Sequence, residues 1–516
     1  MKKILSLFTI SLLVAACGTS KNKTATVKAP ADPIKYAETI TAEDLKTSLY
    51  VYAGDKFQGR ETGKEGEKMA INFLKKHYTE DGISAAKSDG NYFQDVPLVI
   101  SATPDVKVTV NGKTFTNIDD YVSVSTAKDG TLNTKDIVFA GFGIEDSNYS
   151  NYKNLDVNGK VVVIRSGEPK NVDGKYVISG TDKASKWSNF RQEFASKQEI
   201  AKSKGAKALL FYYPEVYAMA ANRFGRSSGR MSLAGGSDAM YYMLINTNLA
   251  KALVSDIETN EKSMSLKSDL SINYKNNSEN IAANNVAAII RGSEKPNEYI
   301  VISAHLDHEG IKDGIVYNGA DDDGSGTVAV LEIAEAFAKA KKDGNGPKRS
   351  IVFLNVTGEE KGLLGSKHYT DNDPIFPLAD TVADLNIDMI GRTDPKREKK
   401  NRNYVYLIGS DKLSTELHNI SEMINTKYMN IDLDYTFNDE NDPNRYYFRS
   451  DHYNFAKNNV PVIFYFNGTH DDYHQPGDTP DKIQYDLLEN RARLVFYTAW
   501  ELANREARIV VDKAAK

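Results

Sequence analysis

Beyond residue 285, the chain alternates short, continuous apolar runs with longer segments that are apolar on one side only. The segment Thr327–Lys341 places Val330, Ile333, Ala334 and Phe337 at helical spacing, which predicts an amphipathic helix. Four apolar runs have the continuity of buried strands: Tyr299–Ala304, Ile351–Val356, Tyr404–Ile408 and Val462–Phe466. Such strands, alternating with helices, predict an α/β fold with a mainly parallel, mixed sheet flanked by helices.

The earlier part of the chain has a different pattern. A helical pattern over Glu65–Tyr78 comes first. Between about residues 100 and 280, turns rich in Gly, Asn and Asp separate short β-rich runs: Val106–Val110, Ile137–Phe142 and Val161–Ile164. This change of pattern predicts a β-rich region that is distinct from the α/β part.

The N-terminus has the pattern of a secretory signal. Met1-Lys2-Lys3 is positively charged, and residues 4–16 form an apolar run too short to span a bilayer as a mature helix. Small residues precede Cys17, an arrangement that resembles the bacterial lipobox and implies removal of residues 1–16 and lipidation of Cys17. A plain signal peptide is the alternative. Residues 17–33 have no apolar periodicity, which predicts a flexible tether.

The lipobox resemblance implies a location. We expect a lipid-anchored protein of the bacterial cell envelope that binds the membrane through Cys17 and faces the periplasm or the outside. Gly18 supplies no Asp signal for inner-membrane retention, so we expect the outer membrane.

Charge and cysteine content exclude several classes of protein. The chain has 65 basic and 70 acidic residues, a formal net charge of −5, whereas a nucleic-acid-binding domain is normally strongly basic. We therefore expect no nucleic-acid partner. One cysteine in 516 residues excludes an intramolecular disulfide, a cysteine-rich zinc finger and a cysteine-ligated iron–sulfur cluster.

Side chains that bind metals follow the predicted strands. His305 and Asp307 come directly after one strand, and Glu359 and Glu360 come after the next. In α/β sheets, ligands bind beyond the carboxyl ends of the strands. Taken alone, each pair also fits ordinary surface residues or the start of a helix, where carboxylates are favoured.

Three further segments add candidates. Asp321-Asp322-Asp323 lies in a glycine-rich turn before the predicted helix, where adjacent carboxylates repel one another unless water or a cation neutralises them. Asp388 is flanked by apolar residues, and His474 follows the last predicted strand. Together the segments offer His, Asp, Glu, Asp and His, a set that can hold two divalent ions sharing one carboxylate. Ligation without cysteine suits zinc, with manganese or cobalt as substitutes.

This set of motifs resembles family M28 of co-catalytic zinc peptidases, the bacterial leucyl aminopeptidase type. The resemblance is carried by the following segments: His305-Leu306-Asp307, Gly319 to Gly326, Glu359-Glu360, Asp388-Met389 and Tyr473-His474, with a further family-like piece at Gly59 to Gly63. It implies two zinc ions per chain and five metal ligands: His305, Asp322 (bridging), Glu360, Asp388 and His474.

The resemblance also implies roles for three other side chains. Glu359 would be the general base, Asp307 would orient His305, and Tyr447 would help to stabilise the oxyanion, although Tyr446 is adjacent. It further implies a cis peptide bond after Asp322. The region 101–280 resembles a protease-associated (PA) domain inserted between residues 34–100 and 281–516 of the peptidase domain.

The remaining histidines depart from the expected ligand set. We expect His308 to be a surface or pocket residue rather than a ligand. His452 and His470 lie near the site in sequence, and we expect both to be structural or to support the ligands, because five ligands are already assigned.

The resemblance implies a metallo-exopeptidase that removes N-terminal residues from peptides. Carboxypeptidase action is an open alternative that needs a basic pocket, for which Arg392, Arg445 and Arg449 are candidates. A glutaminyl cyclase activity is disfavoured by the inserted region, and a catalytically silent binding protein by the complete ligand set. A lipid-anchored envelope scaffold is the non-enzymatic alternative. The oligomeric state stays open.

Overall fold

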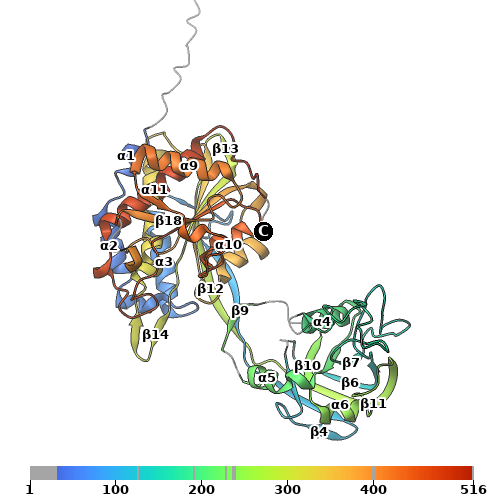
Figure 1. Ribbon diagram of the computed structural model, residues 1–516. Helices are drawn as coiled ribbons and strands as arrows, with labels where there is room; N and C mark the ends of the chain where they lie inside the picture. The colour runs from blue at the N-terminus through green and yellow to red at the C-terminus, as the bar shows by residue number, and fades with distance from the viewer. Residues whose placement is uncertain are drawn as a thin grey trace, which may run out of the picture.

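The computed structural model describes residues 32–124, 127–189, 192–226, 229–234, 240–397 and 401–513. The expected signal peptide, Cys17 and the tether up to residue 31 lie outside the described residues. Within the described part, no helix has both the length and the apolar character needed to cross a membrane. Figure 1 shows two bodies, each built around its own sheet, with β9 and β12 leading from one toward the other.

The larger sheet is mixed. Its strands lie in the order β19 (Asp432–Asp434), β18 (Tyr404–Ile408), β20 (Val462–Phe466), β17 (Thr381–Ile387), β13 (Lys295–His305), β16 (Arg349–Val356), β12 (Glu279–Ile290), β2 (Phe93–Ile100) and β9 (Met231–Leu233), with β1 (Ser84–Ala85) paired to β12. The four central strands β20, β17, β13 and β16 are parallel to one another. Their carboxyl ends therefore meet at one edge of the sheet.

Helices cover both faces of this sheet. One face is covered by α1 (Ile34–Ala37), α2 (Ala42–Tyr52), α3 (Glu65–Glu80), α7 (Gly326–Lys342), α9 (Thr415–Ile424) and α11 (Tyr485–Asn504). The short helices α8 (Leu364–Lys367) and α10 (His452–Ala456) and their loops lie on the other face. Along β13, Ile300 and Ile302 pack into the first layer and Val301 into the second. The continuous apolar strands thus bury both faces, as an α/β fold requires.

The smaller body contains an eight-stranded mixed sheet. Its strands lie in the order β4 (Lys113–Phe115), β3 (Asp105–Val110), β11 (Met264–Lys275), β6 (Gly130–Phe139), β7 (Val161–Arg165), β8 (Ala208–Tyr212), β10 (Tyr241–Ile245) and β5 (Tyr121–Ser123). Helices α4 (Glu193–Ser203), α5 (Pro214–Phe224) and α6 (Thr247–Leu253) accompany it. A separate hairpin, β14 (Gly310–Lys312) and β15 (Ile315–Tyr317), follows β13.

The observed elements differ from the expected ones mainly at their ends. Strands β18 and β20 have the expected bounds, and α7 is one residue longer at each end. Strand β6 ends at Phe139 rather than at residue 142, because Gly141 and Gly143 have positive φ values and turn the chain.

Candidate metal centre

The candidate ligands gather where the central strands of the larger sheet end. His305 is the last residue of β13 and pairs in register with Val356, the last residue of β16. Glu359 and Glu360 follow β16, and Asp388 follows β17 directly. The parallel arrangement therefore brings side chains from distant segments to one edge.

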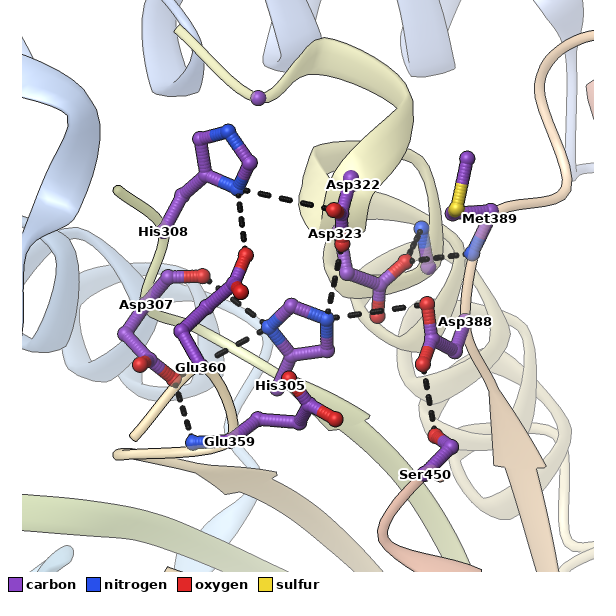
Figure 2. A network of polar contacts seen from close by, with 12 residues as sticks. His305, Asp307, His308, Asp322, Asp323, Glu359, Glu360, Asp388, Met389 and Ser450 are labelled. Atoms are coloured by element: carbon purple, nitrogen blue, oxygen red, sulfur yellow. Dashed lines mark hydrogen bonds and ion pairs between the residues drawn. The ribbon is translucent and has the colours of Figure 1, made fainter. Parts of the chain in front are cut away.

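His305 faces two carboxylates. Its Nε2 lies 3.2 Å from Asp322 Oδ1 and 3.6 Å from Asp388 Oδ1 (Figure 2). Asp388 Oδ2 accepts a 2.6 Å hydrogen bond from the Ser450 hydroxyl, which orients that carboxylate. These three ligand atoms form the first group suited to a metal ion.

A second group uses the other oxygen of Asp322. His474 Nε2 lies 3.1 Å from Asp322 Oδ2 and 3.1 Å from Glu360 Oε2. Asp322 thus contributes one oxygen to each group, which is the position expected for a bridging carboxylate. All five expected ligands lie in these two groups.

The three adjacent aspartates make different contacts. The backbone N–H groups of Asp321 and Asp322 donate to the Asp478 carboxylate, and Asp323 Oδ1 accepts from the N–H groups of Gly326 and Met389. Of the three, only Asp322 faces His305 and His474. The Asp322–Asp323 peptide bond is cis, as expected.

Asp307 contacts His305 through its main chain rather than through its carboxylate. The ring nitrogen Nδ1 of His305 lies 3.0 Å from the main-chain oxygen of Asp307 but 3.9 Å from its carboxylate. That carboxylate instead accepts hydrogen bonds from the Thr62 hydroxyl (2.7 Å) and the Glu359 N–H (3.2 Å). A carbonyl therefore fixes the tautomer of His305, so that its Nε2 lone pair points at the carboxylates.

The placement of Tyr447 also corrects an expectation. Tyr446, Glu359, Asp322 and Asp388 line the pocket at the centre, whereas Tyr447 lines a separate surface pocket. Residues Tyr446–Phe448 form a single 3₁₀ turn, in which successive side chains point about 120° apart. Hence the first tyrosine of the pair faces the centre, and the second packs on His452.

Other side chains also line the pocket. Tyr473 lines it and stacks on the ring of His474 at 3.9 Å, and Arg449, Thr469 and Phe464 line it as well. The position of Tyr473 next to His474 is a signal that sequence analysis alone could have used. Arg449 is one of the three arginines considered from the sequence, whereas Thr469 carries no such signal.

The unassigned histidines occupy three different environments. His470 Nε2 lies 3.2 Å from Asp321 Oδ2, and the buried ring of His452 stacks on Phe464. His308 is not a surface residue: it is fully buried, with Nδ1 2.8 Å from Glu360 Oε1. Of the two placements expected for His308, surface or pocket, the surface is therefore excluded.

The surroundings of Glu359 and Glu360 shift their pKa values in opposite directions. Removal from water raises the pKa of Glu359 well above its usual value, and the nearby charges of Glu360 and Asp388 add to the rise. Burial acts in the same direction on Glu360, but contacts with His308 and His474 outweigh it and lower the pKa of Glu360 to about 2. One glutamate is thus suited to accepting a proton and the other to remaining charged.

Several atoms of the candidate ligands lack hydrogen-bond partners, as expected where a metal ion binds. Among the described residues, His305 Nε2, Asp322 Oδ2 and Glu360 Oε1 are buried without a hydrogen-bond partner. Leaving buried polar atoms without a partner is costly, so their convergence points to a bound cation. Histidine and carboxylate donors without cysteine suit zinc.

Comparison with known proteins supports the same chemistry. Residues 285–499 match the model of peptidase family M28. The chain is 31% identical over 229 residues to leucine aminopeptidase 1 of Sclerotinia sclerotiorum, and the aligned region covers 43% of this chain and 56% of that protein. It is 37% identical over 105 residues to the probable glutamate carboxypeptidase AMP1 of Arabidopsis thaliana, covering 20% of this chain and 14% of that protein.

These curated relatives are thus matched over about half of their length or less. Among solved structures, BSAP, a zinc aminopeptidase from Bacillus subtilis, aligns with a TM-score of 0.46 and 17% identity, covering 91% of this chain and 98% of that chain. The M28 match spans all five candidate ligands and Glu359, and it supports a peptidase hydrolase in this part of the chain.

Proposed function

We propose that this protein is a di-zinc exopeptidase that removes N-terminal residues from peptides. The observation that carries the proposal is the pair of His/carboxylate groups that share Asp322 and open on the same pocket as Glu359. His305, Asp322 and Asp388 would hold one ion, and Asp322, Glu360 and His474 the other. When bound, such a metal pair supplies Lewis acidity and lowers the pKa of a water molecule.

The chain's own residues would carry the proton. Glu359 lines the pocket beside Asp322 and Asp388, where it can accept a proton from the attacking water and return it to the leaving amine. Its N–H donates to the Asp307 carboxylate, so the same aspartate that positions His305 through its carbonyl also fixes the backbone of the base. Apolar side chains of Phe464, Phe466 and Met389 in the pocket would receive a substrate side chain.

Carboxypeptidase action is the second candidate, and Arg449 favours it. Of the three arginines considered from the sequence, only Arg449 lines the pocket. Arg392 pairs with Asp472 at 3.2 Å, and Arg445 lines the separate surface pocket. A guanidinium at the pocket would suit a terminal carboxylate.

Matched peptides test the proposal. One set has free termini, a second an acetylated N-terminus and a third an amidated C-terminus, and mass spectrometry identifies the products. We expect stepwise loss from the N-terminus that is blocked by acetylation and by chelation. Glu359→Gln should lower kcat by about 10²–10⁴-fold while the protein still binds zinc. Blocking by C-terminal amidation instead would establish the carboxypeptidase.

The absence of cleavage in every set by folded, zinc-loaded protein would favour the silent binding protein or the envelope scaffold. A scaffold phenotype would survive Glu359→Gln, whereas an enzymatic phenotype would not.

We further propose that the protein is lipid-anchored through Cys17 in the bacterial envelope, at the outer membrane, and that residues 101–280 are a PA-like insertion. Metabolic labelling with a fatty acid, compared between the wild type and Cys17→Ser, tests the anchor: labelling of both proteins would contradict it.

A further inference from the structure

His308 occupies a closely fitted position beside the metal centre. Its ring is fully buried and packs against Gly319, whose φ is +56°. A Cβ at Gly319 would lie 2.4 Å from Cγ of the imidazole, so only glycine leaves room for the ring. The loop before the three aspartates is thus shaped around this side chain.

The ring nitrogen of His308 points at the carboxylates of the second group. Nδ1 lies 2.8 Å from Glu360 Oε1 and 3.8 Å from Asp322 Oδ2 (Figure 2). Within the described residues, Nε2 of His308 has no hydrogen-bond partner, and Nδ1 faces the carboxylate oxygens of Glu360 and Asp322. A fully buried imidazole that directs one nitrogen at two buried carboxylates has the environment of a ligand.

The two oxygens of Glu360 face two different imidazoles. Oε2 lies 3.1 Å from His474 Nε2, and Oε1 faces His308. His308, Asp322 and Glu360 can each offer one ligand atom, and these atoms lie within 4.8 Å of one another. The ring nitrogens of the buried His452 also lack hydrogen bonds, but its ring stacks on Phe464. The two carboxylates that face His308, rather than its burial, therefore distinguish it as a candidate ligand.

We propose that His308 is a sixth protein ligand of the metal centre and binds, through Nδ1, the ion held by Asp322 and Glu360. This inference rests on the proposed metal-dependent function. A second imidazole adds a borderline-soft nitrogen donor to this site, which favours zinc or cobalt over manganese. The centre would then contain three imidazoles, with His305 and His474 binding through Nε2.

Titration of the metal-free protein with Zn²⁺, Co²⁺ and Mn²⁺ tests the proposal. Chelator competition gives the two dissociation constants, and the Co²⁺ absorption bands report the ligands. We expect His308→Ala to weaken one of two ions by more than about 100-fold, because loss of a ligand exceeds the 10–100-fold effect of a supporting residue. We also expect the variant to change the Co²⁺ spectrum and to lose preference for Zn²⁺ over Mn²⁺.

His368→Ala is the matched control. It truncates another buried imidazole, which lies 3.9 Å from Asp373 and contacts none of the proposed ligands, and it should titrate like the wild type. Two ions bound by His308→Ala with wild-type affinity and spectrum would overturn the role of His308 alone. A wild type that binds no ion would overturn the proposed function as well.

A measurement on the wild type covers the case in which the variant does not fold. Protein labelled with ¹⁵N-histidine and loaded with ¹¹³Cd²⁺ should show three imidazoles coupled to cadmium, one of them through Nδ1. Coupling to only two imidazoles, both through Nε2, would refute the assignment.

Discussion

Both sheets bury charged side chains near the carboxyl end of a strand, but the two sheets differ in whether those side chains have hydrogen-bond partners. In the smaller sheet, Lys197 is fully buried near the carboxyl end of β7 and donates to Glu193 Oε1 (2.6 Å) and to the main-chain oxygens of Arg165 and Gly167 (3.2 and 2.8 Å). Its three donors are satisfied. At the corresponding end of β13, His305, Asp322 and Glu360 leave buried atoms without hydrogen bonds.

This difference separates a structural charge from a functional one. Burial lowers the pKa of Lys197 to about 8, although Glu193 opposes the shift. The free-energy cost of burying this charge is offset by the ion pair with Glu193 and by the two carbonyl oxygens that accept from Lys197. Among the described residues at the end of β13, Asp322 Oδ2 and Glu360 Oε1 lack a hydrogen-bond donor, and a cation would neutralise these carboxylates. At these two places, the satisfied charge supports the fold, and the convergent unsatisfied atoms point to a ligand.

The largest expected effect tests the structural half of this comparison. Lys197→Met should destabilise the smaller body by about 3–5 kcal/mol, because Glu193 is left buried without its partner. The chain has two tryptophans, Trp187 in the smaller body and Trp500 in α11. In a Trp500→Phe background, urea unfolding followed by Trp187 fluorescence measures this loss, and a loss under 1 kcal/mol would contradict it. Zinc affinity should not change.

The next effect concerns the shared carboxylate. Asp322→Asn should weaken binding of both ions by more than about 100-fold, or more than about 2.7 kcal/mol, because Asp322 faces both groups. Chelator competition measures the two constants. If only one ion were weakened, Asp322 would not be the bridge.

Zinc removal should act on one body only. With free zinc at about five times the dissociation constant of each of the two sites, chelation should lower the stability of the larger body by about 2 kcal/mol. In a Trp187→Phe background, the Trp500 transition reports this shift. The Trp187 transition, measured in the Trp500→Phe background, should stay in place. An equal shift of both transitions would show that zinc stabilises the smaller body as well as the larger one.

The smallest expected effect concerns a supporting contact. Thr62→Val removes the hydroxyl that donates to the Asp307 carboxylate and should cost about 1.5 kcal/mol, or about tenfold in kcat/KM. Thr62→Ser keeps the hydroxyl and should restore activity. Equal loss in both variants would point to packing rather than to the hydrogen bond.

Much of the site was predictable because its ligands immediately follow apolar runs. Strands β18 and β20 and helix α7 are marked by continuous or amphipathic patterns, and His305, Glu360 and Asp388 come within four residues of a strand end. The contact between Asp307 and Thr62 was not predictable, because it joins segments 245 residues apart. Nor was the orientation of Tyr446 and Tyr447, which the turn between them decides.

The sequence by itself determined the α/β pattern of the main sheet and the kinds of side chain at its strand ends, because burial periodicity and ligand chemistry are local properties. The tertiary structure alone decided which atoms meet: that Asp322 rather than Asp321 or Asp323 faces His305 and His474, that a carbonyl contacts His305, and that His308 is buried beside Glu360. Adjacent residues share a composition but point in different directions, and only the packing of distant segments fixes which direction faces the site.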